Sequence, residues 1–284
     1  MTLTPGSIQQ LAPGIRRLVA PNPGMMTGAG TNTWILGTRD VAIIDPGPAI
    51  DRHIDAMVDA VGVAIRWVLV THTHPDHSPA AALLAKRTGA AVWGRTAPEG
   101  LHQDATFRPD RILEDGEVLS TGEFELDVIH TPGHASNHLC YRQAPLNWLF
   151  TGDHIINGST VVIDPPDGSM TDYLQSLQRL KSFEIAAIAP GHGEVIDEPY
   201  AAIDWIINHR LEREAKVAAA VTGNPNLTSR ELVPKVYDDV DATLYDVAER
   251  SLLAHLEKLE LDERVLREED RWRAVQALQE PAPK

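Results

Sequence analysis

A short stretch of the chain, HTHPDH, concentrates side chains that bind metal ions. His72, His74 and His77 lie within six residues, together with Asp76. They directly follow RWVLV, an apolar run that predicts a strand buried on both faces. Imidazole nitrogens and carboxylate oxygens are common zinc ligands, and loops at the carboxyl ends of strands are where α/β proteins form sites. The stretch therefore predicts a metal centre.

This pattern, H-x-H-x-D-H after a strand, resembles the signature of the metallo-β-lactamase superfamily. The family's other positions follow in order in HTPGHASNH, LFTGDH and IAPGHG, so the resemblance covers residues 14–197. Each of these motifs lies at an expected strand end beside glycine, where the backbone can turn sharply. The ligands that the resemblance implies are His72, His74 and His134 for a first metal, Asp76, His77 and His192 for a second, and Asp153 as a bridge between them.

Such a ligand set implies a hydrolase with two ions about 3.5–4 Å apart that share a water molecule and lower its pKa. We expect the bridging hydroxide to be the nucleophile and Asp76 to help orient it. Zinc is the expected metal, and iron or manganese suits the same nitrogen and oxygen donors. Cys140 lies within the strand-like run HLCYR, so we expect a buried thiol and no thiolate ligand.

The elements around these motifs predict an α/β fold. Strand-like VAIID, a helix over Ile50–Val61 and a helix over Pro79–Arg87 with Ser78 as N-cap alternate along the chain. With the resemblance, they imply a four-layer αβ/βα metallo-β-lactamase sandwich. We expect this hydrolase domain to span residues 1–204.

The remainder of the chain, residues 205–284, changes character. A long helix, a capping box from Thr228 to Glu231, a helix over Ala242–Glu263 and two terminal strands predict a small winged-helix domain. This arrangement is similar to the β-lactamase-like protein 2 subgroup, in which such a tail packs beside the active site. Members of that subgroup include an animal endoribonuclease for single-stranded RNA and fungal polyketide thioesterases.

Four residues are candidates for contacts to substrate, and each has a simpler alternative role. His154 could donate a proton to a leaving group or form part of the site wall. Ser159 and Thr160 could line a groove or serve only the turn. Arg210 could bind an anionic group or form a salt bridge on the helix surface.

The charge balance bears on the substrate. The chain of 284 residues has 25 Lys or Arg and 40 Asp or Glu, a formal net charge of −15, and both predicted domains are net acidic. Such a surface does not attract nucleic acid without a local basic patch. We therefore rank an activated acyl substrate, such as a thioester or lactone, above single-stranded RNA. A nucleic-acid-binding regulator is a third alternative.

The expected location is the cytoplasm, without a membrane partner. The start, MTLTPGSIQQ, lacks the pattern of a secretory signal, and the sequence has no apolar run of about 18 residues.

We expect the winged helix to act as a lid or as the contact of a homodimer.

Overall fold

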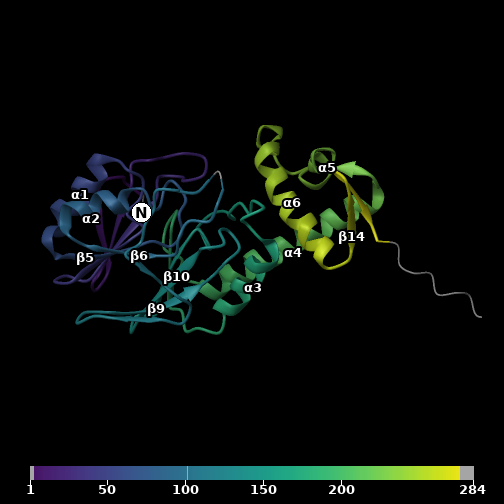
Figure 1. Cartoon of the computed structure of the whole chain (residues 1–284). Coiled ribbons are helices and arrows are strands. Elements are labelled where there is room, and N and C mark those ends of the chain that lie inside the picture. The colour runs from purple at the N-terminus through teal and green to yellow at the C-terminus, as the bar shows by residue number, and fades with distance from the viewer. Residues whose placement is uncertain (1–2, 101, 276–284) are drawn as a thin grey trace, which may run out of the picture.

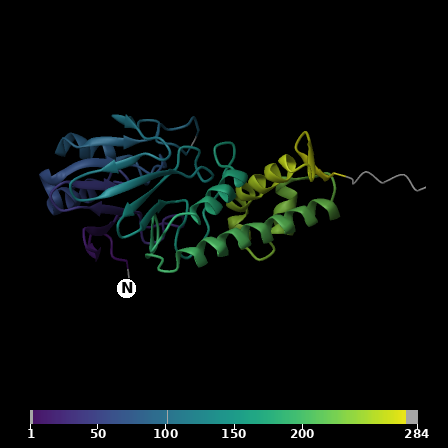
Figure 2. The same ribbon diagram turned by 90° about the horizontal axis from the view of Figure 1, so that it is seen from below.

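The structure is a computed structural model that describes residues 3–100 and 102–275. Figure 1 shows a larger α/β body and a smaller C-terminal body beside it, in green and yellow. One long helix, α4 (Pro199–Gly223), runs from the first body into the second, as the view in Figure 2 makes plain. The expected boundary at residues 204 and 205 therefore lies inside a continuous helix.

The first sheet has seven strands in chain order, antiparallel up to β4 and parallel from β4 to β7. Its strands are β1 (Ile8–Ala12), β2 (Ile15–Val19), β3 (Asn32–Leu36), β4 (Val41–Ile44), β5 (Ile65–Leu69), β6 (Ala91–Gly94) and β7 (Arg111–Ile112). Two helices and one 3-10 turn belong to this half, namely α1 (Asp51–Val61), η1 (Gly62–Ala64) and α2 (Ala80–Thr88).

The second sheet has five strands in the order β12-β11-β10-β9-β8. Only the β11–β12 pair is parallel, because helix α3 (Met170–Leu180) connects these two strands. The strands are β8 (Val118–Ser120), β9 (Glu125–His130), β10 (Leu139–Ala144), β11 (Trp148–Gly152) and β12 (Ala187–Pro190).

The two sheets face each other across an apolar core. Neighbouring side chains of β3 show how strand pleating divides the packing: Trp34 points between the sheets, and Ile35 points outward. The outer face of the first sheet packs on α1 and α2. The outer face of the second sheet packs on α3 and on the first half of α4, through Ile203 and Ile206. This is the expected four-layer sandwich.

The C-terminal body is the expected winged helix. Its elements are α5 (Ser229–Val236), η2 (Ala242–Leu244), α6 (Tyr245–Leu261) and a small sheet of β13 (Leu227–Thr228), β15 (Arg271–Ala274) and β14 (Val265–Glu268). The capping box from Thr228 to Glu231 is confirmed. The C-terminal half of α4 packs into this core through Val217 and Val221.

One predicted helix start was wrong. Pro79, not Ser78, is the N-cap of α2, and no side chain caps this helix. The hydroxyl of Ser78 instead donates to Asp104, 26 residues away, over 2.8 Å. A tertiary contact has therefore replaced the local capping bond that the sequence favoured.

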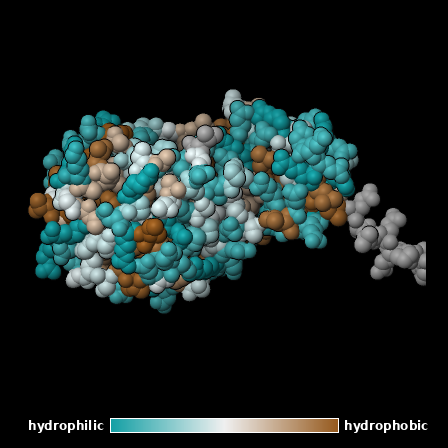
Figure 3. Space-filling view, in the orientation of Figure 1, coloured by the Kyte–Doolittle hydropathy of each residue, from teal (hydrophilic) through white to brown (hydrophobic). Residues whose placement is uncertain are grey.

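None of the helices in the described part of the chain is long and apolar enough to cross a membrane. On the face shown in Figure 3, hydrophilic side chains predominate, and hydrophobic ones lie in separate small groups.

Candidate metal centre

The seven predicted ligands come from four segments that meet at one edge of the sandwich. His72, His74, Asp76 and His77 lie between β5 and α2, and the other three follow β9, β11 and β12. Since strand ends of both sheets meet here, residues as far apart in the sequence as Asp76 and His192 become neighbours.

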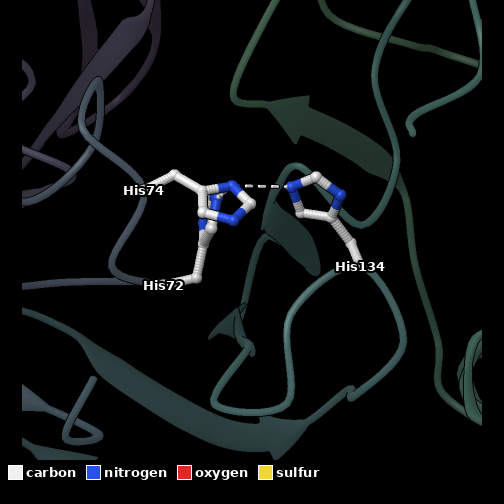
Figure 4. Close-up of side chains that lie close together, drawn as sticks. All are labelled: His72, His74 and His134. Carbon is white, nitrogen blue, oxygen red and sulfur yellow. Dashed lines mark hydrogen bonds between the residues drawn. The ribbon is translucent and has the colours of Figure 1, made fainter. Parts of the chain in front are cut away.

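The first cluster contains three imidazoles. Nδ1 of His74 lies 3.0 Å from Nε2 of His72 and 3.0 Å from Nε2 of His134. Figure 4 shows His134 approaching from a separate loop, opposite the two other rings. Three nitrogen atoms thus converge on one point, an arrangement that can hold a cation.

The second cluster lies next to it. Oδ2 of Asp76 is 3.3 Å from Nε2 of His77 and 3.2 Å from Nε2 of His192. These donor atoms form a second group compact enough for one ion.

Asp153 lies between the two clusters. Its Oδ1 is 3.3 Å from Nε2 of both His77 and His192. Its Oδ2 points the other way and lies 3.8 Å from Nε2 of His134. One carboxylate therefore presents an oxygen to each cluster, as a bridging ligand would.

A buried carboxylate that the sequence analysis missed orients two of these rings. Asp45, which is 1% exposed, accepts hydrogen bonds from Nδ1 of His77 and from the hydroxyl of Thr71. The Thr71 oxygen in turn accepts from Nδ1 of His72 over 3.0 Å. These bonds place the protons on Nδ1 and turn both Nε2 lone pairs toward the clusters. The sequence signal was an acid at the end of the strand-like run VAIID.

Three other predicted ligands are held in place by residues that surround the two clusters. Thr31 donates from its hydroxyl to Oδ2 of Asp76 over 2.9 Å. Nδ1 of His192 lies 3.4 Å from the carbonyl of Gly30, and Nδ1 of His134 donates to the carbonyl of Val162 over 2.7 Å. Backbone and side-chain acceptors thus fix which nitrogen faces inward.

The two clusters differ in electrostatics. Burial, reinforced by the neighbouring His134, lowers the pKa of His74 to about 3, so the first cluster is neutral. Burial also acts to lower the pKa of His192, but Asp153 and Asp76 outweigh it and raise that pKa to about 10. A cation that enters the second cluster must therefore displace protons, as metal ions do when they bind imidazole.

The donor set fits divalent metal ions. Nε2 of His77 and Oδ1 of Asp153 are buried and form no regular hydrogen bond within the described part of the chain. Buried polar atoms are rarely left unsatisfied, so two such atoms that face each other indicate a missing partner. Nitrogen and carboxylate oxygen donors are those that zinc prefers.

Cys140 and His138 lie behind the clusters. Cys140 is fully buried in β10, so the expected buried thiol is confirmed, and burial raises the pKa of this thiol to about 12. The ring of His138 stacks on that of His72 at 4.9 Å, and its Nδ1 lies 3.0 Å from the hydroxyl of Thr131. His138 therefore supports a ligand ring by packing.

The four residues predicted to contact substrate lie in different environments. Ser159 is exposed and Thr160 partly exposed on the turn after β11. His154 is buried against Tyr173, and Arg210 is 3% exposed and donates to the carbonyl of Val161. The surface salt bridge considered for Arg210 is therefore wrong, and substrate contacts for all four stay predictions.

Comparison with known proteins decides the family. The family model described as "Metallo-beta-lactamase superfamily" matches residues 26–192, which is more than half of the chain. The chain belongs to the metallo-β-lactamase superfamily. A second model, "Beta-lactamase associated winged helix domain", matches residues 228–272. The protein is thus a metallo-β-lactamase superfamily hydrolase with the winged helix that accompanies some members.

Relatives that align over most of this chain support the same family assignment. A "Beta-lactamase-like protein 2 homolog" of Drosophila melanogaster is 31% identical over 92% of both chains. An "Atrochrysone carboxyl ACP thioesterase" of Passalora fulva is 29% identical over 81% of this chain and 70% of that protein. A β-lactamase domain protein from Burkholderia ambifaria superimposes with a TM-score of 0.81 at 23% identity, covering 96% of this metallo-β-lactamase family chain and 95% of the other.

Proposed function

We propose that the protein is a dinuclear zinc hydrolase that acts on an activated acyl substrate of the thioester or lactone type. The observation that carries the metal centre is the position of Asp153, whose two oxygens face two separate donor clusters. Iron or manganese would satisfy the same donors. When bound, such ions would lower the pKa of a water molecule and polarise the carbonyl under attack.

The chain's own residues would orient the reactants. Asp76 is the more exposed of the two carboxylates, at 25% against 14% for Asp153, so it is the more accessible to an incoming substrate. Its Oδ2 is held by the hydroxyl of Thr31. Asp76 would therefore hold a water proton on the side of the substrate, and Ser159 and Thr160 remain candidates to contact the acyl group.

Two observations support an acyl substrate. The relative named as an acyl carrier protein thioesterase aligns over 81% of this chain. In addition, the loop between β2 and β3 carries Met25 and Met26, which are 76% and 56% exposed. This loop ends at Gly30 and Thr31, which contact His192 and Asp76. Exposed apolar side chains on a loop rooted at the centre suit an acyl chain.

Charge pairing in the winged helix speaks against RNA as the substrate. Arg230 pairs with Asp246 at 2.6 Å, Arg213 with Asp239 at 2.9 Å and Arg273 with Glu268 at 2.7 Å. These arginines are neutralised within the protein, so they offer little to a phosphate backbone. A lid or homodimer role for this domain and the cytoplasmic location stay predictions.

The deciding experiment is a hydrolysis panel on the purified full-length protein with its metal content measured. Acyl-CoA and acyl-pantetheine thioesters, lactones, β-lactams, a phosphodiester and single-stranded RNA would be offered to zinc-loaded and chelator-treated protein. We expect about two ions per chain and thioester or lactone hydrolysis that chelation abolishes and zinc restores. If the protein cleaves RNA rapidly and leaves the acyl substrates intact, RNA replaces the acyl group as the preferred substrate class. If the protein contains no metal after expression in zinc-replete medium, the proposed metal centre is refuted.

A further inference from the structure

A short segment, Val161–Asp164, connects the winged helix to the candidate metal centre. It belongs to no strand among the described residues, and the carbonyls of Val161 and Val162 accept from side chains instead of from a sheet ladder. The carbonyl of Val162 accepts the hydrogen bond from Nδ1 of His134. The preceding carbonyl, that of Val161, accepts from the guanidinium of Arg210 on α4.

Arg210 is also linked indirectly, through Tyr173, to the backbone next to a second predicted ligand. Its guanidinium lies 5.6 Å from the ring centre of Tyr173, whose hydroxyl donates to the carbonyl of His154 over 2.9 Å. His154 directly follows Asp153 in the sequence. A single buried side chain is therefore linked to the backbone beside His134 and to the backbone beside Asp153.

The far end of the segment is tied to the winged helix as well. Arg250 of α6 lies 3.4 Å from the carboxylate of Asp164. Because this pair is partly exposed, we expect it to be weaker than the buried contact of Arg210. The segment is thus held at one end by α4 and at the other by α6.

We propose that Arg210 is a positioning residue of the metal centre, which holds the segment so that the Val162 carbonyl fixes the ring of His134. Partners of this kind set the tautomer and direction of a ligand imidazole. The winged-helix domain is then a structural part of the metal centre and not only a neighbour of it. This inference rests on the proposed metal centre.

The chain offers a matched control. Arg213, one helical turn further along α4, is also buried, at 8% exposure. It also donates to a backbone carbonyl, that of Val236, and also lies over a tyrosine ring, that of Tyr237, at 4.5 Å. All of these partners belong to the winged helix. Arg213 also forms an ion pair with Asp239, whereas Arg210 contacts the segment beside the candidate metal centre. The two arginines share burial, a carbonyl acceptor and a tyrosine ring, but they contact different domains.

The test compares Arg210→Met, Arg210→Lys and Arg213→Met in the full-length protein. Zinc affinity would be measured by competition with a chromophoric chelator, and Co²⁺-loaded protein would be examined by visible absorption. We expect Arg210→Met to weaken metal binding about 10- to 100-fold and to alter the cobalt spectrum. Arg210→Lys, which keeps the charge and one donor, should bind with intermediate affinity. Arg213→Met should lower the thermal midpoint but leave affinity within about twofold and the spectrum unchanged.

Several outcomes would overturn the inference. Folded Arg210→Met with wild-type affinity and spectrum would do so, and so would equal losses in Arg210→Met and Arg213→Met. If Arg210→Met does not fold by circular dichroism, the lysine variant decides, because a wild-type affinity and spectrum there contradict a positioning role. A wild-type protein that binds no metal would instead refute the proposed metal centre itself.

Discussion

Asp45 accepts a hydrogen bond from Nδ1 of His77 over 2.8 Å at the base of the candidate metal centre. The same carboxylate accepts the amide and the hydroxyl of Thr71, each over 2.8 Å. Asp45 thereby supports the rings of His77 and, through Thr71, of His72. Its backbone φ of 51° is a conformation that aspartate and asparagine tolerate better than most residues.

Replacing Asp45 with asparagine should weaken metal binding without unfolding the chain. The amide tolerates the same backbone conformation but is a poorer acceptor for the imidazole of His77 and the hydroxyl of Thr71, so we expect zinc affinity to fall about 10- to 100-fold. Chelator competition measures this loss. Asp110→Asn is the control, because Asp110 also accepts a backbone amide, that of Val92, yet contacts no ligand. An Asp45→Asn protein with wild-type affinity would contradict the orienting role.

The two-cluster arrangement predicts different metal stoichiometries for different ligand variants. Asp153→Ala removes a donor from both clusters, so it should lose both ions. His192→Ala removes a donor only from the second cluster, so about one ion per chain should remain. Hydrolysis should fall more than about 100-fold in both, beyond the loss expected for an outer partner. Elemental analysis of the folded variants checks the counts, and equal stoichiometries would refute the bridging role of Asp153.

Gly191→Ala should displace the carboxylate of Asp153 by steric contact alone. A Cβ atom at this position would lie 2.5 Å from Oδ1 of Asp153 and 2.9 Å from the backbone of Gly152. Since the Gly152 backbone cannot easily move, we expect Asp153 to shift and metal affinity to drop at least about tenfold. Gly122→Ala, where a Cβ meets nothing within 4 Å, is the control. Wild-type affinity in Gly191→Ala would show that the site can relax.

His255 should make the protein sensitive to acid independently of the metal. It is fully buried in α6, and burial, together with the nearby Arg210, Arg213 and Lys258, lowers its pKa to about 3. Its pKa in the unfolded chain is about 6.5, so the unfolded state binds the proton more readily. The stabilising effect of the neutral ring is complete above that value and is lost as the pH falls below it.

His255→Leu should therefore gain stability relative to wild type as the pH decreases. The difference in unfolding free energy between pH 8 and pH 5 should shrink by about 2 kcal/mol in the variant. Urea unfolding of both proteins at the two pH values, with metal content held equal, measures this change. If His255→Leu changes the unfolding free energy by the same amount at both pH values, His255 is not a source of acid sensitivity.

Local patterns allowed much of the centre to be predicted from sequence. HTHPDH places four donors within six residues after an apolar strand, and the capping box of Thr228 and Glu231 needs only the neighbouring backbone. In both cases the interacting groups are a few residues apart, so spacing alone brings them together. The resemblance to the family then supplied His134, Asp153 and His192.

Residues that depend on sheet register were not predictable in this way. Parallel pairing of Ile44 with Leu69 brings Asp45 beside Thr71, and no local pattern encodes that register. At Ser78 a local pattern was present but misleading, because its hydroxyl donates to Asp104 instead of capping α2. In both places a distant partner determines what a locally ordinary side chain does.

The sequence by itself thus determined which groups can bind metal, since donor type and short spacing are local properties. Only the tertiary structure decided how they are oriented. It joined Asp45 to His77, Val162 to His134 and Arg210 to Val161, across separations of 32, 28 and 49 residues. Such contacts form only when the sheets, α4 and the winged helix pack together, because the hydrophobic cores between them fix the distance between segments.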